Sequence, residues 1–154
     1  MVNIPESYNY ISAFLTFRCN LNCRYCINKY NGLYEYKEMD YIDWTSGLRK
    51  IETRKDLPIT ITGGEPTTHC GFYQILQNLG KTHSIDVLTN GKFDLIHFLD
   101  NTSRSWFKRE AKYATIRFSY HPGYTNIVEL LKKVYRLKKE DYSVGVWAVG
   151  NTLK

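Results

Sequence analysis

Short apolar runs rich in β-branched residues alternate along the chain with longer stretches whose apolar residues recur every three or four positions. Short runs of this kind are typical of strands buried in a parallel sheet, and the longer spacing is typical of amphipathic helices. The runs predict five strands, at residues 11–17, 59–62, 84–88, 114–119 and 142–149.

Helices are predicted between these strands from apolar stripes and end signals. The stripes are Tyr41, Trp44, Leu48 and Ile51; Phe72, Ile75, Leu76 and Leu79; and Ile127, Leu130, Leu131, Val134 and Leu137. Asp40 and Asn126 are suitable N-caps for the first and last of these helices, and Gly80 ends the middle one. A short helix is predicted over 94–99, whereas the polar, basic segment 100–112 has no assignment.

Strands that alternate with helices predict an α/β fold in which parallel strands are joined by right-handed crossovers. We expect a partial (β/α) barrel of about five parallel strands, formed by one domain that spans residues 1–154. In such barrels the chemistry lies at the carboxyl ends of the strands. The final strand would be an exposed edge.

Composition narrows the class of protein only slightly. The chain has 154 residues, 43% hydrophobic and 23% charged, which are ordinary values for a globular domain. Its net charge of +6 is spread along the sequence, and the basic run at 132–139 lies on the polar face of a predicted helix, so nucleic-acid binding is not indicated. No apolar run is long enough to span a membrane, and the N-terminus lacks a signal-peptide profile.

Three of the four cysteines, Cys19, Cys23 and Cys26, follow the first predicted strand within eight residues. Cysteines without a secretory signal favour a reducing, cytoplasmic setting, where thiols bind metals or take part in redox chemistry. A zinc site or an ordinary iron–sulfur cluster takes four protein ligands. Three cysteines would leave one coordination position open for chemistry.

The spacing Cys-x3-Cys-x2-Cys resembles that of the radical S-adenosylmethionine (radical SAM) superfamily. The strand at 59–62 is followed by Gly63-Gly64-Glu65-Pro66, which is similar to the Gly-Gly-Glu-Pro that follows the second strand of these proteins. The two motifs together are much more specific than either alone. The resemblance implies that Cys19, Cys23 and Cys26 hold a 4Fe–4S cluster whose fourth iron binds S-adenosylmethionine. The core of that family has six β/α units, so the resemblance also implies that one or more C-terminal units are missing here. We expect a truncated core, a fragment of a longer product; the alternatives are a partner that covers the open edge and a naturally minimal core.

The resemblance also implies that six other residues contact S-adenosylmethionine: Tyr25, Gly63, Gly64, Glu65, Asn90 and Ser119. Tyr25 would lie near the adenine, as the aromatic residue before the third cysteine does in the family. Glu65 and the backbone of the glycine pair would engage the amino group, because glycine lets backbone approach a ligand closely. Asn90 and Ser119 follow the third and fourth strands and are matched to polar groups of the ribose or carboxylate.

The activity implied by the resemblance is reductive cleavage of S-adenosylmethionine. The cleavage yields methionine and a 5′-deoxyadenosyl radical, which abstracts hydrogen from a substrate. The sequence does not say whether that substrate is a small molecule, a peptide or a macromolecule. An electron donor such as flavodoxin or ferredoxin is also implied.

Two other functions compete with this interpretation. The first is a glycyl-radical-enzyme activase, a short member of the same superfamily that acts on a partner protein. The second is a non-catalytic zinc or iron–sulfur binding module, with His69 or Cys70 as the fourth ligand. Two residues stay open: His121 is either a loop residue or faces the substrate, and Trp147 faces either the cofactor or an outer helix.

Overall fold

The computed structural model describes residues 1–30, 37–54 and 56–150, which form seven strands, five α-helices and two short 3-10 turns. The strands are β1 (Val2–Asn3), β2 (Ile11–Thr16), β3 (Ile51–Glu52), β4 (Ile59–Gly63), β5 (Ile85–Thr89), β6 (Ile116–Tyr120) and β7 (Val144–Ala148). The helices are α1 (Ile27–Tyr30), α2 (Tyr41–Leu48), α3 (Phe72–Leu79), α4 (Leu95–Asn101) and α5 (Ile127–Lys139), and the turns are η2 (Pro66–Thr68) and η3 (Arg104–Phe107).

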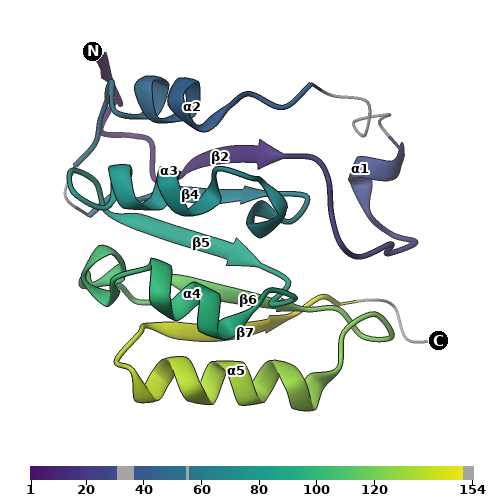
Figure 1. The fold of residues 1–154 in the computed structure, drawn as a ribbon. Coiled ribbons are helices and arrows are strands. Elements are labelled where there is room, and N and C mark those ends of the chain that lie inside the picture. The colour runs from purple at the N-terminus through teal and green to yellow at the C-terminus, as the bar shows by residue number, and fades with distance from the viewer. Residues whose placement is uncertain (31–36, 55, 151–154) are drawn as a thin grey trace.

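Five of the strands form one parallel sheet in the order β2-β4-β5-β6-β7. The prediction of an α/β fold with five parallel strands is confirmed. The sheet is open, with β2 and β7 at its edges, and the described residues close no barrel. All five strands point the same way, so their carboxyl ends lie on one side together with α1 and the loop that leaves β2 (Figure 1).

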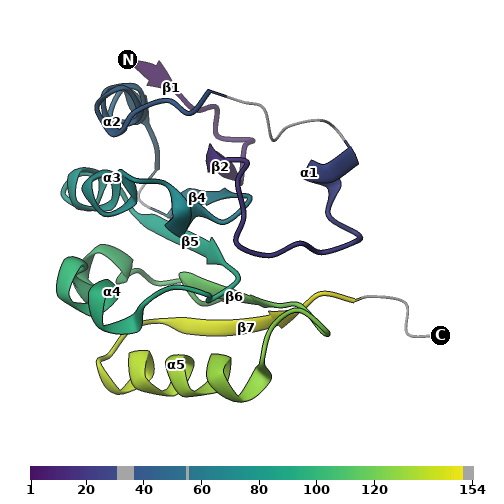
Figure 2. The same cartoon turned by 45° about the vertical axis from the view of Figure 1, so that its right-hand side comes forward.

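The sheet has an outer face covered by helices and an inner face turned towards α1 (Figure 2). Residues alternate between the two faces along each strand. Ile61, Val87 and Phe118 are fully buried in the core, whereas the side chains next to them in sequence include Leu88 and Ser119, which line a cavity on the inner face. This alternation separates the apolar core from the polar side chains of the site.

The helix predicted to carry Ile51 is shorter than its apolar stripe suggested. Helix α2 begins after Asp40, whose carboxylate accepts hydrogen bonds from the Ile42 and Asp43 amides, and it ends at Leu48. Ile51 instead lies in β3, which pairs in parallel with β1. The prediction for Ile51 was therefore wrong, because pairing with a distant segment is invisible to local spacing.

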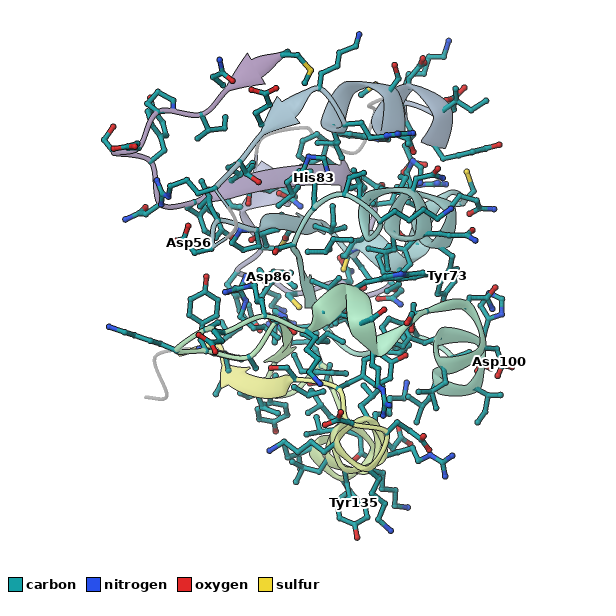
Figure 3. The ribbon with its side chains drawn as sticks, turned by 90° about the vertical axis from the view of Figure 1, so that its left-hand side faces the viewer. Asp56, Tyr73, His83, Asp86, Asp100 and Tyr135 are labelled. Atoms are coloured by element: carbon teal, nitrogen blue, oxygen red, sulfur yellow. The ribbon has the colours of Figure 1, made fainter. Side chains whose placement is uncertain are left out.

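The segment without a prediction closes the inner face at the amino ends of the strands. Its Arg109 donates two hydrogen bonds from Nη2 to the Asp86 carboxylate, at 2.9 and 2.8 Å, and Arg117 Nη2 lies 3.5 Å from the same group. The Tyr113 ring lies about 5 Å from both guanidinium groups. Figure 3 views these ends of the strands, with Asp86 inside the molecule and Asp56 at its periphery.

Among the described residues, no helix combines the length and the apolar character that crossing a membrane requires.

Candidate functional site

A cavity of about 280 Å³ opens at the carboxyl ends of β2, β4, β5 and β6. Its lining contains all nine residues that the sequence singled out: Cys19, Cys23, Tyr25, Cys26, Gly63, Gly64, Glu65, Asn90 and Ser119. Side chains that come from four different strand ends thus meet in one place, as the fold rule predicts. Their roles as ligands stay predictions, and the contacts below show what each does within the protein.

The three cysteines are free thiols that surround this cavity. The Cys26 amide donates to the Cys23 carbonyl oxygen at 3.2 Å, so the last two cysteines share one turn. In the part of the chain that the structure describes, no three cysteine, histidine or acidic side chains are arranged to hold a single metal ion. Three thiols that line one cavity are a suitable ligand set for an iron–sulfur cluster, because cysteine thiolates are the usual ligands of such clusters.

His69 and Cys70 do not complete a zinc site with these thiols. Both line a different cavity, whose lining contains none of the three cysteines. His69 is buried, with Nε2 2.9 Å from the Met39 carbonyl oxygen and Nδ1 accepting from the Gly71 amide. Cys70 is exposed. The zinc alternative therefore lacks the fourth ligand that the sequence offered.

The glycine pair seats the chain that leads into the cysteines. A Cβ on Gly64 would lie 2.2 Å from the Arg18 carbonyl oxygen, and one on Gly63 would lie 2.2 Å from that of Thr16. The Gly64 amide donates to the Thr16 carbonyl oxygen at 2.7 Å. Sequence reasoning assigned the glycines to close approach of a ligand. The structure shows that they also let the backbone of residues 16–18 approach closely, and this segment leads from the end of β2 to Cys19.

Glu65 ties the end of β4 to the end of β5. Its fully buried carboxylate accepts hydrogen bonds from the Asn90 amide, the Thr89 hydroxyl and the Thr67 hydroxyl, each at 2.7 Å. The Thr67 amide donates as well, at 3.2 Å. Burial raises the pKa of the Glu65 carboxyl, and these donors oppose that shift. The carboxylate predicted to meet a ligand's amino group is thus already satisfied by the protein.

Asn90 continues these contacts to the first cysteine. Its Nδ2 donates to Asn20 Oδ1 at 2.8 Å and lies 3.6 Å from Cys19 Sγ. Asn20 in turn donates to the Lys92 carbonyl oxygen at 2.7 Å. Burial also raises the pKa of the Cys19 thiol. Asn90 therefore fixes the start of the cysteine segment, a role that its predicted contact with a ligand did not include.

Tyr25 faces the end of β6. Its hydroxyl lies 2.9 Å from Nδ1 of His121, which also lines the cavity. Burial raises the pKa of Tyr25 to about 12, so the hydroxyl is protonated at neutral pH. Sequence reasoning left His121 open and missed Tyr124, which packs edge-on against Tyr25. The only sequence signal for these two residues was their position after a strand.

Ser119 and Trp147 lie on the inner face. They are register partners on β6 and β7, and partners in a parallel pair point to the same side of the sheet. Because Ser119 lines the cavity, Trp147 faces inwards as well, and its ring covers the backbone of Gly145. The structure thus settles the orientation that the sequence left open: Trp147 faces the inner side, not an outer helix.

Comparison with known proteins identifies the family of the chain. Residues 14–146 match the family model of the radical SAM superfamily. The chain is 32% identical over 107 residues to 7-carboxy-7-deazaguanine synthase of Clostridium acetobutylicum, which covers 66% of this chain and 47% of that protein. It is 30% identical over 99 residues to GTP 3′,8-cyclase of Haemophilus ducreyi, which covers 56% of this chain and 27% of that protein.

Solved structures share the fold over nearly the whole chain. SuiB of Streptococcus suis superposes with a TM-score of 0.64 at 17% identity, covering 95% of this chain and 34% of SuiB. SuiB bound to S-adenosylmethionine gives a TM-score of 0.62 at 18% identity. The chain spans about half the length, or less, of these proteins. The family match and the cysteine site together show that the chain belongs to the radical SAM superfamily, enzymes whose cofactors are a 4Fe–4S cluster and S-adenosylmethionine.

Proposed function

We propose that Cys19, Cys23 and Cys26 hold the 4Fe–4S cluster and that S-adenosylmethionine binds in the adjoining cavity. The observation that carries the proposal is that the three thiols and the Gly63-Gly64-Glu65 segment line one space. Together the two cofactors supply one-electron chemistry that removes a hydrogen atom from a substrate. The protein supplies the binding, the orientation and the surroundings of that chemistry.

The residues around the cavity have distinct tasks in this proposal. Glu65, Thr89 and Asn90 hold the cysteine segment through hydrogen bonds between protein groups. The apolar side chains of Phe14 and Leu88 also line the cavity. Preorganised polar groups beside an apolar wall make electrostatic contacts to a charged ligand stronger than they are in water.

The substrate and the reductant are proposed only as classes. The relatives named above are a deazaguanine synthase and a GTP cyclase, and one SuiB structure is bound to the precursor peptide SuiA. Purine-like small molecules and peptides are therefore the two candidate substrate classes. We expect a cytoplasmic reductant such as flavodoxin or ferredoxin.

The test is anaerobic reconstitution of the cluster, reduction with dithionite in the presence of S-adenosylmethionine, and assay for 5′-deoxyadenosine. The wild-type chain should form the product and Cys23→Ala should not. Cys70→Ala is the matched control, because that exposed thiol lies outside the cavity and its loss should leave the product yield unchanged. Retention of zinc in place of iron under these conditions would overturn the proposal.

A further inference from the structure

The segment from Cys19 to Cys26, here called the cluster loop, is held at two separate places. Its first half contacts the turn after β5 through Asn90, as described above. Its second half contacts the turn after β6, about one hundred residues away in the sequence. The known motifs of the chain account for the first contact but leave the second without a role.

His121 is the centre of the second contact. Its Nδ1 lies 2.9 Å from the Tyr25 hydroxyl and 3.8 Å from Cys23 Sγ. The His121 and Tyr25 rings are nearly parallel, 10° apart in orientation, with centroids 6.0 Å apart. One side chain therefore contacts both the second cysteine and the residue directly before the third.

Tyr124 adds a second point of attachment. Its hydroxyl accepts a hydrogen bond from the Arg24 amide at 2.9 Å, and its ring packs edge-on against Tyr25 with centroids 5.8 Å apart. The loop residues 23–25 are thus bound through a side chain and through the main chain.

The turn that carries these two residues is fixed by its own hydrogen bonds. The His121 carbonyl oxygen accepts from the amides of Tyr124 and Thr125, both at 3.0 Å, and from the Thr125 hydroxyl. The His121 amide lies 3.1 Å from that same hydroxyl oxygen and donates to it. Because the backbone of His121 is held from both sides, its imidazole is a firm support for the cluster loop.

We propose that His121 is a positioning residue for the second half of the cluster loop, holding Tyr25 and thereby the Cys23–Cys26 turn in the geometry that accepts the cluster. The proposal rests on the proposed function. It assigns His121 no contact with S-adenosylmethionine or substrate. It predicts that His121 and Tyr25 act as one unit, so that removing either breaks the same support.

The test compares His121→Ala, Tyr25→Phe and the double variant after anaerobic reconstitution. Loss of a single hydrogen bond should speed the release of iron to a chelator by about 2- to 12-fold in each single variant. The double variant should be no faster than the single ones, because residues in one contact are not additive. The electron paramagnetic resonance spectrum of the reduced cluster, recorded without S-adenosylmethionine, should change in the same way in all three.

Two further variants separate positioning from general damage. His121→Asn places a polar atom near the Nδ1 position and should restore slow iron release and the wild-type spectrum. His83→Ala is the matched control: His83 Nε2 lies 2.8 Å from the Ile51 carbonyl oxygen, near the amino ends of the strands (Figure 3). This variant should release iron as slowly as the wild type even where its thermal unfolding shifts.

The outcomes distinguish the two proposals. A wild-type chain that takes up no iron would overturn the proposed function, and this inference with it. A wild type that takes up iron, with His121→Ala indistinguishable from His83→Ala, overturns the inference alone. Additive effects in the double variant also overturn it. So does weaker binding of S-adenosylmethionine with unchanged iron release, which would make His121 a ligand contact.

Discussion

The two sides of the cavity are built differently. On the β4–β5 side, here called the closed side, Glu65, Thr89 and Asn90 are at most 5% exposed, and each is bound to another protein group. On the β6–β7 side, here called the open side, Ser119 and His121 are half-buried and Trp147 is 43% exposed. Both sides come from parallel strands of the same sheet.

The difference indicates how one sheet can separate residues that hold the cluster loop from residues that can contact a substrate. A buried, fully hydrogen-bonded group is costly to leave unpaired, so the closed side has little freedom to take a new partner. We infer that it is a fixed frame for the first half of the cluster loop. On the open side His121 supports the second half of that loop, whereas Ser119 and Trp147 keep exposed surface on the inner face, which is where a substrate of variable shape would be met. Four changes test this division.

Asp86→Ala should have the largest effect, because Asp86 on β5 pairs with Arg109 and with Arg117 on β6 and so supports both sides from below. Asp86 is fully buried, and removing one partner of a buried ion pair leaves an uncompensated charge. We expect the free energy of unfolding in urea to fall by about 3–5 kcal/mol.

Asp56→Ala is the control for this change. Asp56 also forms an ion pair, with Arg54, but its side chain is 73% exposed (Figure 3). Exposed pairs contribute about 0–1 kcal/mol. Equal losses in the two variants would show that the Asp86 cluster is not a shared base for the two sides.

Thr89→Val tests the closed side directly. The change removes a buried hydroxyl that donates to the Glu65 carboxylate at 2.7 Å and accepts from the Gly91 amide at 3.1 Å, while keeping the volume of the side chain. Hydrogen bonds to charged groups contribute about 1.5–3 kcal/mol, so we expect a loss of that size in urea unfolding together with lower iron uptake. Normal stability and iron uptake would show that the Glu65 carboxylate does not need the Thr89 hydroxyl to support the cluster loop.

Gly64→Ala tests the seat of the cluster loop. A Cβ here meets the Arg18 carbonyl oxygen at 2.2 Å, and backbone has to move to make room. Overpacking of this kind costs about 1–3 kcal/mol, and the displaced chain leads directly into Cys19. Iron bound per chain after reconstitution should fall more than the stability does.

Gly47→Ala is the matched control, because Gly47 lies in α2 with nothing within 4 Å of an added Cβ. Alanine in a helix interior is favoured over glycine by about 1 kcal/mol, so this variant should be slightly more stable and bind iron normally. Equal iron binding by the two variants would show that Gly64 does not position the chain that leads into Cys19.

These variants also show which features the sequence could predict. The five strands, the order of the motifs and their meeting at one edge follow from local patterns and from the geometry of parallel sheets. The position of the candidate site was predicted mainly from the spacing of the three cysteines. Such features depend on residues that are close in sequence or repeat regularly, and the structure contains them with boundaries shifted by one or two residues.

The contacts that hold the site together could not be predicted. His121 meets Tyr25 across 96 positions, and Arg109 meets Asp86 across 23. No local sequence pattern encodes a contact between residues so far apart. Secondary-structure propensity does not distinguish a histidine in one turn from a histidine in another. The close approach of the glycine pair to the Thr16–Arg18 backbone could not be predicted either, and the approach of these glycines to a ligand stays a prediction.

Trp147→Ala should have the smallest effect on stability. It is therefore the clearest test of whether the open side contacts the substrate. The ring lies on the inner face of an edge strand and is 43% exposed, so its loss should change the free energy of unfolding by about 0.5 kcal/mol or less. If Trp147 takes no part in holding the cofactors, iron content and 5′-deoxyadenosine formation without substrate should equal those of the wild type. Turnover of a substrate, once one is identified, should fall, because an exposed aromatic side chain on the inner face is a typical binding anchor. Loss of iron in this variant would instead show that the exposed side chains of the open side also hold the cofactors, and the two sides would then differ in exposure but not in task.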